Sequence, residues 1–278
     1  MSGSAILDAR GAPDARTRDV IDSTHHPAAA RVADVLRSRS SRPRTLVIDD
    51  EENIAQAIRA KVTIIAVCTS VSELDDALGL QKKAPSADVH VFTDEVMSSL
   101  FGHERRSRVF ALAHAPRPAS WRDIADAPGD LVVLDAVKIA GNIGAIIRSA
   151  CAFGAAGVVL LDSGITSIYD RRLIRASRGL LFSIPVLLAT ASELETFLRA
   201  ERMLLASMTA DAASPLTAIA ATAERVAILM GSERRGASDA LTAIAGQRYA
   251  VPMAPGVESL NVSVAAAIAL YERGRART

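Results

Sequence analysis

Residues 131–162 read LVVLDAVKIAGNIGAIIRSACAFGAAGVVLLD, and this stretch decides the fold class of the second half of the chain. The apolar runs at its two ends predict buried strands, and the isoleucines between them recur at helical spacing. A turn at 138–142 separates the first run from the helix, which we expect over 143–154. The stretch therefore predicts one strand, helix and strand unit.

Similar apolar runs follow along the chain. RMLLASMTA at 202–210, RVAILMG at 225–231 and RYAVPMA at 248–254 are separated by helical segments. Such runs are typical of a parallel sheet that is buried on both faces, so we expect a second α/β domain from residue 131. Residues 28–113 also alternate between helix-like and strand-like pieces and predict a smaller α/β domain.

Two other segments lack an apolar period. Residues 1–27 are polar, and we expect a disordered tail there. Residues 114–130 contain three prolines and are interpreted as a linker. The predicted organisation is thus a tail at 1–27, a domain at 28–113, a linker at 114–130 and a domain at 131–278.

The glycines of the opening stretch do not fit a dinucleotide site. That fingerprint needs G-x-G-x-x-G and an acid about 20 residues later, whereas Gly141 and Gly144 are spaced G-x-x-G. Gly154 instead suits a helix C-terminus with positive φ, and Asn142 falls where an N-cap belongs. A nicotinamide-dependent dehydrogenase is therefore disfavoured.

Composition narrows the class of protein further. The 278 residues carry a net charge of +1, so a nucleic-acid surface has to be local. Cys68 and Cys151 have no CxxC spacing and are interpreted as core thiols, and we expect no metal site. No apolar run has the length of a membrane helix and no secretory signal is recognisable, so we expect a cytoplasmic protein without membrane association.

Arginine is concentrated in two segments. RVADVLRSRSSRPR at 31–44 and HERRSR at 103–108 are both strongly basic. The planar guanidinium suits phosphates and stacking on bases, which favours an RNA contact. A GC-rich genome or a solvated surface would also explain the arginines, and both alternatives stay open at this point.

Two further stretches indicate where a ligand binds. ILMGSERRGAS at 228–238 and VPMAPGVESLNVSVAAAIALYE at 251–272 each pass from a strand into a loop with small or polar residues. Loops at the carboxyl ends of neighbouring parallel strands form the ligand crevice of an open α/β sheet. Together with the loop of the opening stretch, they predict one shared site.

These three stretches resemble the ordered motifs of the SpoU/TrmH branch of the SPOUT RNA methyltransferases. The similarity covers most of residues 130–273. TSIYDRRLIRASRGLLFSIPV at 166–186 and RVFALAHAPRPASWRDIA at 108–125 are similar to the thiostrepton and nosiheptide resistance methyltransferases. This second likeness extends through the N-terminal domain.

The resemblance implies a fold and an activity. It implies a C-terminal domain with a deep trefoil knot that binds S-adenosylmethionine, an N-terminal domain similar to ribosomal protein L30e that grips RNA, and a homodimer. It also implies methylation of the ribose 2′-hydroxyl of one adenosine in the thiopeptide-binding loop of 23S ribosomal RNA.

The resemblance also assigns roles to residues of this chain. Asn142 and Arg148 match the reaction centre. The residues that match the cofactor cradle are Met208, Gly231, Ser232, Glu233, Val251, Met253, Glu258, Ser259, Leu260 and Asn261. The arginines expected to contact RNA are Arg44, Arg105, Arg106, Arg108 and Arg178. Arg235 departs from the motif, since relatives usually carry glycine there.

The expected chemistry agrees with these residue types. A guanidinium is a poor base because it holds its proton very tightly, so Arg148 is interpreted as an electrostatic group that polarises the 2′-hydroxyl, with Asn142 orienting it. The identity of the proton acceptor stays open. Two alternative functions also stay open: a housekeeping SpoU enzyme with another RNA target, and an RNA-binding protein without activity.

Overall fold

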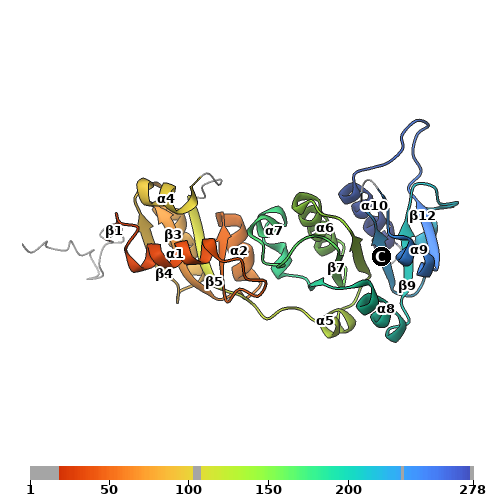
Figure 1. Cartoon of the computed structure of the whole chain (residues 1–278), viewed down its shortest axis with the longest axis horizontal. Helices are drawn as coiled ribbons and strands as arrows, with labels where there is room; N and C mark the ends of the chain where they lie inside the picture. The colour runs from red at the N-terminus through yellow and green to blue at the C-terminus, as the bar shows by residue number, and fades with distance from the viewer. Residues whose placement is uncertain (1–18, 103–107, 233–234, 276–278) are drawn as a thin grey trace, which may run out of the picture.

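The computed structural model describes residues 19–102, 108–232 and 235–275. It contains two α/β domains that follow one another along the long axis of the molecule (Figure 1). This confirms the predicted α/β class. Among the described residues, no helix is long and apolar enough to cross a membrane.

The N-terminal domain is built on a five-stranded mixed sheet with the order β1-β4-β3-β5-β2. Strand β5 runs antiparallel to both β2 and β3, while β4 pairs with β1 and β3 in parallel. The strands are β1 (Val20–Ile21), β2 (Thr45–Asp49), β3 (Ile64–Ser70), β4 (Asp88–Phe92) and β5 (Val109–His114). The helices are α1 (Pro27–Arg37), α2 (Glu51–Arg59), α3 (Leu74–Lys83) and α4 (Asp94–Phe101).

The predicted tail is shorter than expected. Residues 1–18 lie outside the described residues, but Val20 and Ile21 pair with Val91 and Phe92 of β4. Ile21 is buried against the sheet. The prediction of disorder as far as residue 27 is therefore wrong for this part, because a two-residue edge strand is too short to show a period in the sequence.

The C-terminal domain contains a seven-stranded sheet in the order β10-β12-β9-β11-β6-β7-β8. Its strand pairings are parallel, as predicted. The strands are β6 (Leu131–Asp135), β7 (Gly157–Leu161), β8 (Val186–Leu188), β9 (Leu204–Met208), β10 (Ser214–Pro215), β11 (Val226–Met230) and β12 (Gln247–Ala250). The helices are α5 (Trp121–Asp126), α6 (Ala140–Ala152), α7 (Arg171–Ala176), α8 (Ala191–Ala200), α9 (Asp239–Ile244) and α10 (Val262–Arg275).

Alternate residues of the central strands face two different cores. On β6, Val132 and Leu134 pack in the core with α6, α7 and α10, whereas Leu131 and Val133 pack in the core with α5, α8 and α9. The strands are therefore buried on both faces, which explains why their sequences are continuous apolar runs. Helix layers are visible on both sides of this sheet in Figure 1.

Helix α5 lies within the segment that was predicted to be a linker. Ser120 and Asp123 form a capping box at its start, Ile124 is fully buried, and the ring of Trp121 stacks on Phe197 at a centroid distance of 4.7 Å. The prediction that all of 114–130 is a linker is therefore wrong. The prolines lie on either side of the helix, which is too short to show a clear apolar period.

The two domains are held together by contacts of α7 and the segment that follows it. The carboxylate of Asp49, on β2, is 1% exposed and accepts hydrogen bonds from Nε and Nη2 of Arg171. Gln56 Nε2 donates to Ser183 Oγ at 2.8 Å. Burial raises the pKa of Asp49 above its usual value, although Arg171 acts in the opposite sense. The buried pair thus sets the orientation of the domains more than it adds stability.

A second buried ion pair anchors the C-terminal helix to the sheet. Arg273 Nε and Nη2 donate to the carboxylate of Asp130 at 2.8 and 3.1 Å, and both side chains are 3% exposed. The remaining guanidinium hydrogens reach the carbonyls of Ile219, Thr222 and Glu224. Asp130 also accepts from the backbone N–H of Val226, at the start of β11.

We expect Arg273→Met to lower the free energy of unfolding by about 3–5 kcal/mol, because Asp130 would stay buried without its counter-ion. Urea denaturation of the full chain measures this change. Arg275→Met is the matched control on the same helix, since Arg275 is 61% exposed and its pair with Glu272 is worth at most about 1 kcal/mol. Equal losses in the two variants would contradict the assignment.

Candidate functional site

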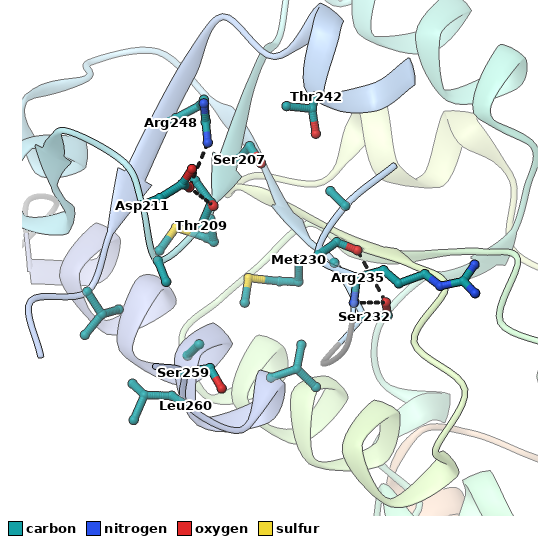
Figure 2. Close-up of a pocket in the computed structure, with 18 of the residues that line it drawn as sticks. Ser207, Thr209, Asp211, Met230, Ser232, Arg235, Thr242, Arg248, Ser259 and Leu260 are labelled. Atoms are coloured by element: carbon teal, nitrogen blue, oxygen red, sulfur yellow. Dashed lines mark hydrogen bonds and ion pairs between the residues drawn. The ribbon is translucent and has the colours of Figure 1, made fainter. Parts of the chain in front are cut away.

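A pocket of about 520 Å³ opens at the carboxyl ends of β9, β11 and β12. These strands are neighbours in the sheet, so the loops that follow them meet at one edge, as predicted. The predicted cofactor residues that line the pocket are Met208, Gly231, Ser232, Val251, Met253, Ser259 and Leu260. Figure 2 shows Met230 between the polar residues on the two sides of the pocket.

The loop after β11 is held in a tight turn. Ser232 N donates to Gly236 O at 3.0 Å, and Gly236 N donates to Ser232 O at 2.9 Å. A Cβ added at Gly231 would lie 1.9 Å from Ala237 N and 2.0 Å from Gly236 C, so position 231 admits only glycine. Glu233, which was predicted to bind the cofactor, lies outside the described residues.

Asp135 fixes the far end of the same loop. Its buried carboxylate, at the end of β6, accepts a hydrogen bond of 2.7 Å from the backbone N–H of Ser238. Sequence reasoning missed this residue, although an acid that ends an apolar strand is a visible signal. This hydrogen bond connects the loop of the second motif, at 228–238, to β6, the strand directly before the first motif.

A polar cluster on the other side of the pocket was also missed. Asp211 accepts hydrogen bonds from Thr209 Oγ1 and from Arg248 Nη2, the latter at 2.8 Å, and all three residues line the pocket (Figure 2). The Thr209 hydrogen bond and then Arg248 hold the pKa of Asp211 below its usual value. The carboxylate is therefore anionic at neutral pH. Its sequence signal is the polar Thr-Ala-Asp directly after β9.

Asn142 and Asn261 meet beside the pocket. Asn261 Nδ2 donates to Asn142 Oδ1 at 3.2 Å, and Asn261 Oδ1 accepts from the backbone N–H of Ser263 at 2.8 Å. This joins the first and third motifs. Neither asparagine lines the pocket, and Glu258 does not line it either.

The prediction that Asn142 is an N-cap is wrong. Helix α6 begins at Ala140, its N-cap position is Ile139, and Asn142 lies inside the first turn. The helix starts earlier than predicted because the turn residues before Ile143 already have helical geometry. The prediction for Gly154 is confirmed, since it follows the helix with a φ of 67°.

Arg148 lies on the exposed surface of α6, six residues beyond Asn142. It makes no hydrogen bond or ion pair with another residue of the described part of the chain and does not line the pocket. A single chain therefore does not bring Arg148 together with the predicted cofactor residues. Its guanidinium is available to a molecule that approaches α6 from outside.

The arginines predicted to contact RNA are spread over both domains. Arg178 follows α7 with a φ of 51° and contacts Glu52 of the N-terminal domain at 3.3 Å. Arg108 is 71% exposed and pairs with Glu73 at 3.0 Å. Arg44 is exposed, and Arg105 and Arg106 lie outside the described residues.

Comparison with known proteins identifies the family. Residues 130–271 match the SpoU rRNA methylase family over the whole of the parallel sheet. The chain belongs to the SpoU rRNA methylase family. Residues 18–127 of this family member match the N terminus of the thiostrepton-resistance methylase. The predicted resemblance is therefore confirmed for both domains.

Two curated relatives of this SpoU methylase are similar along most of their length. The 23S rRNA (adenosine(1067)-2′-O)-methyltransferase of Streptomyces azureus is 42% identical over 260 residues, which are 92% of this chain and 95% of that protein. The enzyme of the same description from Streptomyces laurentii is 40% identical over 259 residues, which are 92% and 96% of the two chains.

Solved structures share the fold. The crystal structure of an RNA 2′-O ribose methyltransferase superposes with a TM-score of 0.76 at 28% identity and covers 93% of this chain and 99% of that one. The SpoU methyltransferase AviRb of Streptomyces viridochromogenes, in complex with AdoMet, has a TM-score of 0.76 at 23% identity over 91% and 99% of the two chains.

We expect Gly231→Ala to weaken binding of S-adenosylmethionine by more than about tenfold, or about 1.4 kcal/mol, because the added methyl group displaces the backbone at residues 236–237. Isothermal titration calorimetry measures the affinity. Gly79→Ala is the matched control, since a Cβ there meets nothing within 4 Å inside α3. An unchanged affinity of the Gly231 variant would exclude this loop from the cofactor site.

Proposed function

We propose that this chain transfers a methyl group from S-adenosylmethionine to the ribose 2′-hydroxyl of adenosine 1067 of 23S rRNA and thereby gives resistance to thiostrepton-type antibiotics. The observation that carries the proposal is the 42% identity to the enzyme of that specificity, which extends through both domains. An identity of this extent includes the RNA-facing domain as well as the domain with the pocket.

The pocket fits the proposed cofactor. Its volume of about 520 Å³ lies in the range of small-molecule sites. Met208, Val251 and Leu260 offer apolar surface to a nucleoside base. Asp211 and Arg235, on opposite sides of Met230 in Figure 2, offer charges of both signs to a ligand that carries an ammonium and a carboxylate.

The cofactor supplies a methyl group that its sulfonium already activates, so the chain mainly has to position the attacking oxygen at about 3 Å from it. Arg148 contributes by stabilising negative charge on the 2′-oxygen. Asn142, held by Asn261 at 3.2 Å, orients the start of the helix that carries Arg148.

We propose that the enzyme is a homodimer that associates through α6 and α10. Large apolar side chains are exposed on and beside these helices: Ile139 at 59%, Phe153 at 40%, Val264 at 47% and Tyr271 at 51%. The rings of Phe153 and Tyr271 meet edge to face at 6.0 Å, so they form one patch. Such patches mark interfaces, and a two-fold axis here would present Arg148 to a second chain. The trefoil knot and the likeness of the first domain to L30e stay predictions.

We expect Arg148→Ala to lower the rate of methyl transfer by about 10²–10³-fold, because it removes the charge that stabilises the oxyanion. Affinity for S-adenosylmethionine should stay within a few-fold, since Arg148 does not line the pocket. Arg199→Ala is the control, because Arg199 is 78% exposed on α8. Single-turnover transfer to 23S rRNA measures the rate, and retained turnover would remove Arg148 from the reaction centre.

Heterodimers test whether Arg148 serves the pocket of its partner. We expect a purified dimer of one Arg148→Ala chain and one Gly231→Ala chain to retain roughly half the wild-type turnover, because one of its two equivalent sites is intact. At a cofactor concentration near the wild-type Kd, both parent homodimers should turn over more slowly than this heterodimer. A heterodimer as slow as its parents would assign Arg148 to the pocket of its own chain, and failure to isolate any dimer would overturn the proposed assembly.

Mass-spectrometric mapping of 23S rRNA after incubation with protein and cofactor tests the reaction itself. A 2′-O-methyl group at adenosine 1067, with thiostrepton-resistant translation by the treated ribosomes, is the expected result. A methyl group at another ribose would favour the housekeeping alternative. Absence of both cofactor binding and methylation would favour the non-catalytic one.

A further inference from the structure

A groove of about 1360 Å³ runs between the two domains. One wall comes from α1, α4 and β2 of the N-terminal domain, and the other from residues 166–175 of the catalytic domain, including the start of α7. Figure 1 shows α7 next to the N-terminal domain and away from α9 and β12, whose residues line the cofactor pocket. The groove is therefore separate from the cofactor pocket, and no residue lines both.

The groove has more positive charge than its own acids can neutralise. The arginines in its walls are Arg37, Arg39, Arg171, Arg172 and Arg175, and Asp170 is the one acid among the lining residues. Three of these arginines have close partners: Arg37 pairs with Asp34 at 2.7 Å, Arg172 pairs with Asp170 at 2.7 Å, and Arg171 pairs with Asp49. The surplus charge lies on Arg39 and Arg175.

These two arginines lie on opposite walls. Arg39 is exposed and has no hydrogen bond or ion pair to any residue within the described ranges. The Nε of Arg175 is 4.0 Å from Asp49 Oδ2, at the limit of an ion pair, and its side chain is 26% exposed. Arg175 makes no hydrogen bond to another described residue, so its guanidinium can still donate to an anion in the groove.

The two walls are joined by the side chain of Arg171. The guanidinium of Arg171 lies 4.7 Å from the centre of the Phe101 ring at the end of α4, while it bonds Asp49 at the end of β2. Thus one side chain of the catalytic domain contacts two elements of the other wall. The groove is therefore formed by the domain interface, and its arginines already line it before a ligand binds.

We infer that this groove binds the phosphodiester backbone of RNA, with Arg39 and Arg175 contacting phosphates from opposite sides. The inference rests on the proposed function, which provides an RNA substrate. It adds a second RNA-binding site, in a groove that is separate from the reaction centre. Guanidinium groups match phosphate geometry, and hydroxyl groups commonly donate to phosphate oxygens. The hydroxyl side chains that line the groove are Ser38, Ser40, Thr45, Ser99, Thr166 and Ser167.

Salt dependence of RNA affinity tests the inference. Log affinity falls as log salt rises, and each lost phosphate contact makes this fall less steep by roughly 0.7–0.9 log units per log unit. The double variant Arg39→Gln with Arg175→Gln should therefore flatten the slope by about 1.5. The single variant Arg39→Gln, which changes an exposed side chain, should flatten the slope by about half as much. The matched control is Arg122→Gln with Arg199→Gln, since these arginines are 89% and 78% exposed on α5 and α8.

The measurement uses the full chain and two RNAs of equal length, a 23S rRNA fragment that contains adenosine 1067 and an unrelated hairpin. We expect the groove variants to show a higher KM for the 23S fragment, an unchanged kcat and an unchanged affinity for S-adenosylmethionine. An unchanged salt slope, or an equal change in the control variant, would overturn the inference. So would displacement of the RNA by polyglutamate of equal charge at equal concentration, because the groove would then be a site for acidic protein.

The outcome separates this inference from the proposed function. Backbone contacts do not depend on base sequence, so the groove variants should weaken binding of both RNAs. Absence of methylation by the wild-type protein, with RNA binding that still depends on Arg39 and Arg175, would refute the proposed reaction and support the groove. Methylation by the wild-type protein, together with groove variants whose KM equals that of the wild type, would support the proposed reaction and refute the groove.

Discussion

The buried pair of Asp130 and Arg273 is the constraint on which the catalytic domain depends. Asp130 stands directly before β6 and receives the first N–H of β11, while Arg273 lies near the end of α10. One carboxylate therefore fixes two central strands and the last helix at the same end of the sheet. Because α10 is a rigid rod, its first turn is positioned at the opposite end, where Asn261 meets Asn142. The alignment of the third motif with the first follows from an interaction that neither motif contains.

The sequence was sufficient to predict the elements that form continuous apolar runs. The strands around residues 132, 158 and 228 are buried on both faces, so nearly all of their residues are apolar. Elements with little burial of their own were missed or misread. Strand β1 has two residues, β8 has three, and α5 has six, so their stability comes from partners distant in the chain such as Phe92 and Phe197. Those partners cannot be recognised from the sequence of the element itself.

The candidate site divides in the same way. The residues on the loops after β11 and β12 could be predicted because the resemblance and the position at strand ends agree, and most of them line the pocket. Asp211 and Asp135 were missed although each stands at or just after the end of an apolar strand, because their hydrogen bonds to Thr209, Arg248 and the backbone of Ser238 exist only in the assembled fold. Gly144 is a similar case, because an added Cβ would lie 2.4 Å from Ala176 on α7, and its spacing from Gly141 gave no indication of that contact.

The walls of the pocket come from residues 207–265, and the last helix, whose first turn completes them, is tied to Asp130 through Arg273. These residues are synthesised after the N-terminal domain and after most strands of the parallel sheet. A nascent chain that contains the N-terminal domain and strands β6 to β11 still lacks Arg273, the partner of Asp130, and the residues after β12 that line the pocket. The pocket can therefore close only after both domains have most of their strands, so its assembly is a later step of folding than the formation of either sheet.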